Sequence, residues 1–188
     1  MPKKVAFTII SVVSLATIYY LVSVQIKKHS EEKMRAGISN TEVPDDFNVS
    51  LKRSGCMGTC PRYSVSINAK GHVTFHGEQF VRIKGEASDK VLPNEIKRLK
   101  YMVDSMNYFS QKDEYGYDVP LQQPDPDCPA GKMPDVGLHE TTVIADGRRK
   151  TIILHNGCTG LPIVKELFRF SSAIDEITNS SQWVENIN

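Results

Sequence analysis

The feature that most constrains this chain is an uncharged, apolar run near its N-terminus. Two lysines precede the run, two lysines close it, and no charged side chain occurs from Val5 to Ile26. A helix over this stretch would be roughly 33 Å long, close to the thickness of the hydrocarbon core of a bilayer. Tyr19 and Tyr20 lie towards its outer half, where aromatic side chains meet the membrane surface. The run predicts a single transmembrane anchor within residues 1–28.

A cleaved signal peptide is the alternative, because Ser14-Leu15-Ala16 forms a small-x-small cleavage site. Cleavage there would leave an apolar stretch at a new N-terminus, and the run is longer than the core of a typical signal peptide. The uncleaved anchor is therefore favoured. Flanking charge does not set the orientation, since basic residues lie on both sides. The short tail before the run is easier to retain than a whole domain, so we expect the domain outside the inner (cytoplasmic) membrane.

The remaining chain is divided into a charged linker, residues 29–46, and one domain, residues 47–188. The net charge of +1 argues against a nucleic-acid partner, which requires a basic face to displace counterions. There is no G-x-S-x-G motif, no phosphate-binding glycine loop and no H-E-x-x-H motif. The sequence therefore predicts no catalytic residue, cofactor or metal ligand. The expected partners are the membrane and an unknown protein or envelope ligand.

Apolar side chains at odd-numbered positions indicate strands with one apolar face and one polar face. These positions fall into four short stretches: 47–51, 63–67, 73–75 and 81–83. A three-residue loop over residues 69–71 would pair Ile67 with Val73, and Gly71 would supply the left-handed conformation that such a loop needs. A second tight turn is expected at residues 77–79. The four strands would form an antiparallel meander.

Two helices are expected to follow, one after Pro93 and one after Pro162, because apolar residues recur there at helical spacing. Between them, two alternating stretches predict a β-hairpin closed by Asp146-Gly147, in which His139 faces Leu154. The predicted fold class is α+β: a four-stranded antiparallel meander covered by a helix, then a β-hairpin and a C-terminal helix. Trp183 is expected to pack on the core, and the proline-rich segment 110–137 is expected to be a solvated loop.

The most distinctive segment runs from Ser54 to Tyr63. Its cysteines and the residues around them are Gly55, Cys56, Gly58, Thr59, Cys60, Pro61 and Tyr63. The segment resembles the C-x-G-T-C-P-x-Y opening of an uncharacterised bacterial family, one of the domains of unknown function. The resemblance covers about Phe47 to Val184 and includes Tyr115 and Asp135 as a possible binding loop. It implies an exported or membrane-anchored protein and no established activity. Leu92 departs from the family, which usually has a capping Ser or Thr there.

Cys56 and Cys60 allow three readings. A structural disulfide is favoured, because Gly58 lets the two side chains approach and an extracytoplasmic site would preserve the bond. Cu(I) binding is the second reading, since two thiolates and a histidine suit a soft metal. Thiol–disulfide exchange is the third, although it usually depends on a helix N-terminus that lowers the thiol pKa. Cys128 and Cys158 would form a second bridge, although sequence alone leaves three pairings open.

These observations predict a non-enzymatic binding or structural domain anchored in the envelope. The alternative function is a redox or copper-handling domain that uses Cys56 and Cys60.

Overall fold

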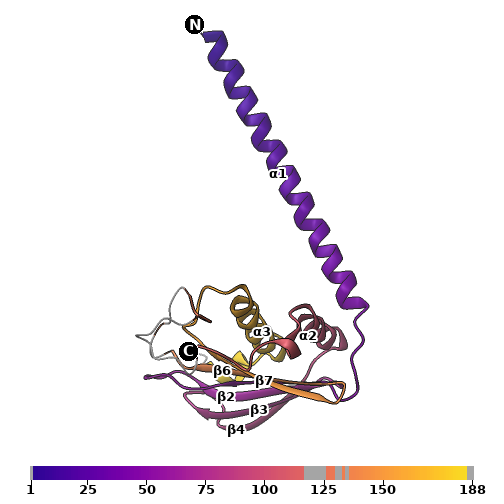
Figure 1. Ribbon diagram of the computed structural model, residues 1–188, viewed down its shortest axis with the longest axis vertical. Coiled ribbons are helices and arrows are strands. Elements are labelled where there is room, and N and C mark those ends of the chain that lie inside the picture. Colours follow the sequence, from indigo (N-terminus) through magenta and orange to yellow (C-terminus); the bar gives the residue numbers. More distant parts are fainter. Residues whose placement is uncertain (1, 117–125, 130–132, 134–135, 186–188) are drawn as a thin grey trace. The chain divides into compact units, whose positions relative to one another are not determined.

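The chain divides into two compact units, Met1–Asn40 and Thr41–Asn188. The first unit is one helix, α1 (Pro2–Ser39), so the charged segment after the apolar run is helical as far as Ser39 (Figure 1). The computed structural model describes residues 2–116, 126–129, 133 and 136–185, with side chains described from Tyr19 onward.

The predicted membrane anchor falls largely on residues 2–18, whose side chains lie outside the described part of the chain. Within the described part, no helix is long and apolar enough to cross a membrane.

The second unit is built on a seven-stranded sheet with the strand order β4-β3-β2-β1-β6-β7-β5. Helices α2 and α3 lie on one side of this sheet (Figure 1). In chain order the elements are β1 (Asn48–Arg53), β2 (Arg62–Asn68), β3 (His72–Gln79), β4 (Gly85–Lys90), α2 (Pro93–Ser105), the 3-10 helix η1 (Tyr108–Ser110), β5 (Glu114–Tyr115), β6 (Leu138–Ala145), β7 (Arg148–His155), α3 (Pro162–Thr178) and α4 (Ser181–Val184).

The first three strands form an antiparallel meander in the predicted register. Ile67 pairs with Val73, so residues 69–71 form the loop between β2 and β3. Gly71 has a φ of 78°, a left-handed conformation that glycine adopts without strain. The loop, its glycine and the pairing are therefore confirmed.

The prediction of a fourth strand at Val81 and Ile83 is wrong. β3 includes residues 77–79, where a tight turn is expected from the sequence, and a bend then precedes β4. The bend folds back on β3: the main-chain oxygen of Ile83 lies 2.0 Å from where a Cβ on Gly77 would stand. The Ile83 N–H donates to the Trp183 carbonyl at 2.9 Å. The hydrogen bond to Trp183, which is distant in the sequence, thus holds residues 81–83 in a bend instead of the strand that the alternation predicts.

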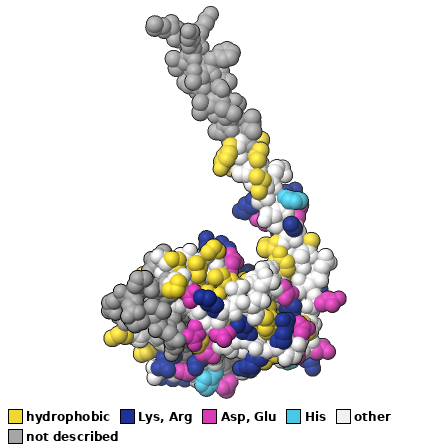
Figure 2. Space-filling view, viewed as in Figure 1, with side chains coloured by type: hydrophobic (Ala, Val, Ile, Leu, Met, Phe, Trp, Pro, Cys, Tyr) yellow, Lys and Arg dark blue, Asp and Glu magenta, His cyan; other side chains and the backbone are white. Residues whose placement is uncertain are grey.

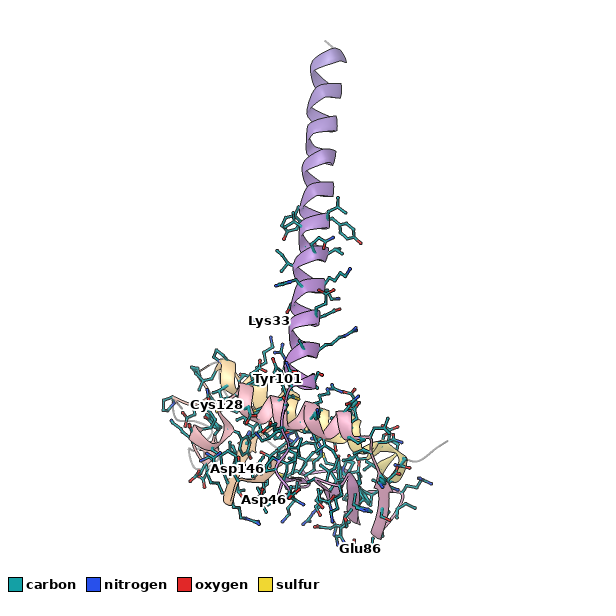
Figure 3. All side chains as sticks on the ribbon, turned by 90° about the vertical axis from the view of Figure 1, so that its right-hand side faces the viewer. Lys33, Asp46, Glu86, Tyr101, Cys128 and Asp146 are labelled. Carbon is teal, nitrogen blue, oxygen red and sulfur yellow. A yellow bond between two sulfur atoms is a disulfide. The ribbon has the colours of Figure 1, made fainter. Side chains whose placement is uncertain are left out.

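The hairpin between β6 and β7 is confirmed, including the pairing of His139 with Leu154. Asp146 and Gly147 have φ values of 53° and 70°, the left-handed pair that a two-residue hairpin loop requires. Asp46 lies beside this turn (Figure 3). Its carboxylate accepts the N–H groups of Asp146 and Gly147 at 3.0 and 2.7 Å. The residues just before β1 are thereby fixed to the hairpin.

The meander is only one half of the sheet. β6 pairs with β1 on the side opposite β2, so Val49 lies between Ile67 of β2 and Val143 of β6. β1 is therefore a central strand. β5 contributes two residues and runs parallel to β7, which makes the sheet mixed. The α+β class is confirmed, whereas the predicted four-stranded sheet is corrected to a seven-stranded one.

The core lies between the sheet and the two long helices. The odd-numbered positions of β1 to β3 face it, as the alternation predicts, and they are buried together with the apolar stripes of α2 and α3. Trp183 also packs on the core, as expected, with its ring 4.9 Å from that of Phe75. Leu92 is the N-cap of α2 and makes no side-chain hydrogen bond there. Pro93 is the first residue of the helix, where an N–H group would have no partner within the helix, so its absence has no cost.

Candidate functional site at the end of the sheet

Cys56 and Cys60 are joined by a disulfide, with their Cα atoms 5.5 Å apart. They lie in the connection between β1 and β2, residues 54–61, which we call the disulfide loop. Both cysteines are half-buried, whereas Gly58 and Thr59 at the tip of the loop are exposed. Among the described residues of this unit, Met57 is the most exposed large apolar side chain, at 85%. The bond therefore holds a short, solvent-facing tip at one end of the sheet.

Two glycines allow the loop to pack closely at its base. A Cβ on Gly55 would stand 2.9 Å from Cδ of Arg62, so the absence of a side chain leaves room for the arginine. Gly137 has a φ of 73°, and a Cβ there would stand 2.7 Å from the main-chain oxygen of Gly55. Gly58 has no such constraint from the described residues, among which its Cβ would meet only the Cys56 Sγ, at 3.7 Å. The motif glycines thus have different structural roles.

The second disulfide joins Cys128 to Cys158, with their Cα atoms 5.0 Å apart. Both side chains are almost fully buried, at 2% and 0% exposure. The bond ties residues 126–129 to the segment just before α3. The pairing that the sequence leaves open is therefore 56 with 60 and 128 with 158.

A row of polar side chains lies beneath the disulfide loop, on the face of the sheet that carries the core. Arg53 of β1 pairs with Tyr63 of β2 on one side and with His139 of β6 on the other. Asp175 and Ser180 approach this row from α3 and the turn that follows it. We call these five residues the polar cluster.

Asp175 is the centre of the polar cluster. Its carboxylate accepts hydrogen bonds from Arg53 Nε at 2.8 Å, from the Tyr63 hydroxyl at 2.7 Å and from the Ser180 hydroxyl at 2.8 Å. Arg53 also forms an ion pair with it through a terminal nitrogen. A charged pair that is mostly removed from water needs such additional bonds to offset desolvation. The cluster therefore anchors the end of α3 to the sheet.

His139 completes the row as a neutral imidazole. A terminal nitrogen of Arg53 contacts Nε2 of His139, and because a guanidinium can only donate, Nε2 must accept and the proton must lie on Nδ1. Burial and the neighbouring Arg53 charge lower the pKa of His139 to about 3. Within the described part of the chain, Nδ1 has no hydrogen-bond partner. The ring stands edge-on to Phe168, with the centroids 5.7 Å apart.

The cluster is occupied by its own members. Burial, followed by the negative charge of Asp175, raises the pKa of Tyr63, so its hydroxyl stays protonated and bonded to that carboxylate. The accepting nitrogen of His139 faces Arg53 rather than a nucleophile. General acid–base chemistry requires a group within reach of the substrate proton. The hydrogen bonds of the cluster therefore hold its side chains in place, and its titratable groups are not positioned for proton transfer to a substrate.

A hollow of roughly 160 Å³ opens above the cluster, between the disulfide loop and the C-terminal segment. The residues around it are Arg53, Ser54, Cys60, Pro61, Tyr63, Val136, Asn156 and Val184. Three motif residues, Cys60, Pro61 and Tyr63, therefore reach it, whereas Gly55, Gly58 and Thr59 do not. A volume of this size admits a single small chemical group rather than a whole cofactor. Among the described residues, no group of three His, Cys, Asp or Glu side chains could hold a metal ion.

Residues 47–178 match the family described as "Domain of unknown function (DUF6438)". The chain belongs to this family. The matched residues contain both disulfides and four members of the polar cluster, and Ser180 lies just beyond them. No curated protein matches the chain.

One further predicted position of this DUF6438 domain, Tyr115, does not line the hollow. Tyr115 is a buried residue of β5, and its hydroxyl donates to the side-chain oxygen of Gln111 at 3.1 Å. Asp135 lies outside the described residues. Arg53 and Asp175 were not predicted as site residues from the sequence. Arg53 could have been found, because it continues the odd-numbered, inward-facing positions of β1 with a charged side chain.

Proposed function

We propose that this chain is a membrane-anchored module whose domain lies outside the cytoplasm and binds another component of the envelope. The observation that carries the proposal is the pairing of all four cysteines in two disulfides, Cys56–Cys60 and Cys128–Cys158. Structural disulfides persist in oxidising compartments and are rare in the cytosol of mesophilic cells. The buried Cys128–Cys158 bond is the stronger support, because it closes a long segment of chain and lies within the core.

The anchor is supported by the surface of α1. Between Tyr19 and Ile26 the large apolar side chains are exposed, and the sequence before them carries no charge back to Val5. Figure 2 shows these apolar side chains on the helix where its side chains are described. Removing a large apolar side chain from water is favourable by roughly 1.5 to 3 kcal/mol of free energy. Insertion into a bilayer would provide that burial.

A binding role is supported over catalysis by the state of the polar cluster. Arg53, Tyr63 and Ser180 all donate to Asp175, and His139 is held by Arg53. Apart from Nδ1 of His139, the polar atoms of the cluster bond to one another, and such bonds hold a surface in a fixed shape that suits recognition. The domain would present the disulfide loop and the hollow as rigid features.

The alternative is a thiol-redox or copper-handling function at Cys56 and Cys60. One observation favours it: this pair is half-buried, whereas Cys128 and Cys158 are almost fully enclosed. Against it, the loop leads into strand β2 rather than a helix, so no helix dipole lowers the pKa of a thiol there. We therefore assign Cys56–Cys60 a structural role.

A reporter enzyme that is active only outside the cytoplasm, fused after Asn188, is expected to give activity in cells. The reason is that all four cysteines are paired in disulfides, which persist in oxidising compartments outside the cytoplasm. The matched control lacks residues 1–28 and should lose the activity. The fusion should also keep its full length, because the anchor is not cleaved. Activity from a cytoplasmic reporter alone would reverse the topology, and loss of the N-terminal segment would show a cleaved signal peptide.

A further inference from the structure

The sheet has an incompletely paired edge. β7 runs from Arg148 to His155, but β5 pairs with it only at Ile153 and Leu154. Within the part of the chain that the structure describes, no strand lies on the outer side of β7 between Arg148 and Ile152. An edge of this kind offers main-chain hydrogen-bonding groups to another extended segment.

The direction of the β7 main chain identifies which groups are offered. Ile153 directs its N–H outward, where it donates to the Asp113 carbonyl at 2.8 Å. Successive residues of a strand alternate in direction, so Arg149 and Thr151 also direct their N–H and C=O groups outward. No hydrogen bond between these outward groups and another main-chain segment occurs in the described residues. A further strand could therefore continue the ladder that β5 begins.

A groove of roughly 650 Å³ follows this edge, within the size range of ligand sites in proteins. On the core side it is walled by two contacts between β7 and the segment before β5. The Arg148 guanidinium lies 4.2 Å from the centre of the Phe109 ring, and Lys150 forms an ion pair with Asp113. These contacts hold residues 109–113 against the side chains of Arg148 and Lys150, and the groove beside them is also lined by Arg149 and Thr151.

The charge of the edge selects among possible occupants. Arg148, Arg149 and Lys150 are consecutive, and within the described residues Arg149 has no ion-pair partner. Basic side chains on an edge strand prevent indiscriminate pairing with other strands. Arg148 pairs with Asp146 and Lys150 with Asp113, so Arg149 is the charge of this edge that would attract a strand with a carboxylate opposite it.

We propose that the outer edge of β7 is the docking site for an extended acidic segment of a partner protein, which adds to the sheet beside β5. Main-chain hydrogen bonds to Arg149 and Thr151 would provide affinity. The positive charge of the Arg149 side chain would make the site specific for an acidic sequence. The proposal rests on the proposed binding function and names the chemistry of the partner.

The test uses the full-length protein, isolated from its native compartment with free thiols blocked. The probe is a short synthetic peptide in which glutamate alternates with threonine, and the matched probe has lysine in place of glutamate. Hydrogen exchange of the Arg149 and Thr151 amides is measured with each. We expect the glutamate peptide to slow exchange at both amides roughly tenfold or more at saturation, and the lysine peptide to have no effect.

Two variants assign the effect to the edge. Arg149→Glu should weaken binding of the glutamate peptide roughly tenfold, because it reverses the charge of a basic side chain that has no ion-pair partner among the described residues. Lys52→Glu makes the same change on central strand β1 and should leave binding unchanged. Unchanged exchange at Arg149 and Thr151, or equal binding of the two peptides, would overturn the proposal. Free thiols in the isolated protein would instead count against the proposed function, so the two failures are distinguishable.

Discussion

Phe75→Asp is expected to unfold the domain. Phe75 is fully buried at the centre of β3, with the rings of Tyr63 and Trp183 packed against it at 5.4 and 4.9 Å between centroids. The substitution removes these contacts and places a carboxylate without a partner in the apolar core. Loss of a large buried ring and burial of a charge together cost roughly 5 kcal/mol or more. A typical domain is stable by only about 5 to 15 kcal/mol. Thermal or chemical denaturation of the full-length protein measures the effect.

Thr74→Asp is the matched control. Thr74 is the neighbour of Phe75 in β3 and lies on the exposed face of the sheet. An exposed carboxylate in a strand costs at most about 1 kcal/mol. Similar losses of stability for the two variants would contradict the assignment of the odd-numbered face to the core.

Stability is expected to fall between pH 7.5 and pH 5 in a way that depends on His139. The folded protein keeps this imidazole neutral, with a pKa of about 3, whereas an unfolded chain protonates it near 6.5. Below pH 6.5 protons therefore bind preferentially to the unfolded state. The stability that depends on a neutral His139 is complete above pH 6.5 and is lost as the pH falls towards 3. At pH 5 the loss is roughly 2 kcal/mol in the free energy of unfolding. Chemical denaturation at the two pH values measures it.

His139→Gln should reduce this pH dependence, because glutamine can accept the Arg53 hydrogen bond and does not titrate. Other groups near the ring, Arg53 of β1 and Asp175 of α3, are retained in the variant. His72→Gln changes an exposed imidazole on β3 and serves as the control. If both variants keep the pH dependence of the parent protein, His139 is not the buried neutral group described here.

The parts of the fold that could be predicted depend on local patterns. The alternation up to Phe75 follows from burial of one face, and Gly71 and Asp146-Gly147 provide the left-handed residues that their loops require. The failure at Val81 and Ile83 has a non-local cause. Their alternation is that of a strand, but hydrogen bonds to the C-terminal segment hold this stretch as a bend. β5 could not be predicted because a strand of two residues is too short to show an alternation of apolar and polar side chains.

The candidate site could be predicted only in part, for a similar reason. The cysteine motif is visible in the sequence because its members are contiguous. The polar cluster is not, since Arg53 and Asp175 are brought together from opposite ends of the domain. Periodicity could have identified Arg53 as an inward-facing charge, but its partner depends on how α3 packs on the sheet. His139 was correctly placed opposite Leu154, although its neutral state depends on Arg53.

The proposed function requires that the domain works in an oxidising compartment with both cysteine pairs bonded. The most direct measurement is mass spectrometry of the protein alkylated in intact cells, before and after reduction. We expect all four cysteines to be protected from alkylation until reduction, with Cys56 bonded to Cys60 and Cys128 bonded to Cys158. Free thiols at Cys128 and Cys158 would contradict the extracytoplasmic location. Free thiols at Cys56 and Cys60 alone would instead favour the redox or copper-handling function.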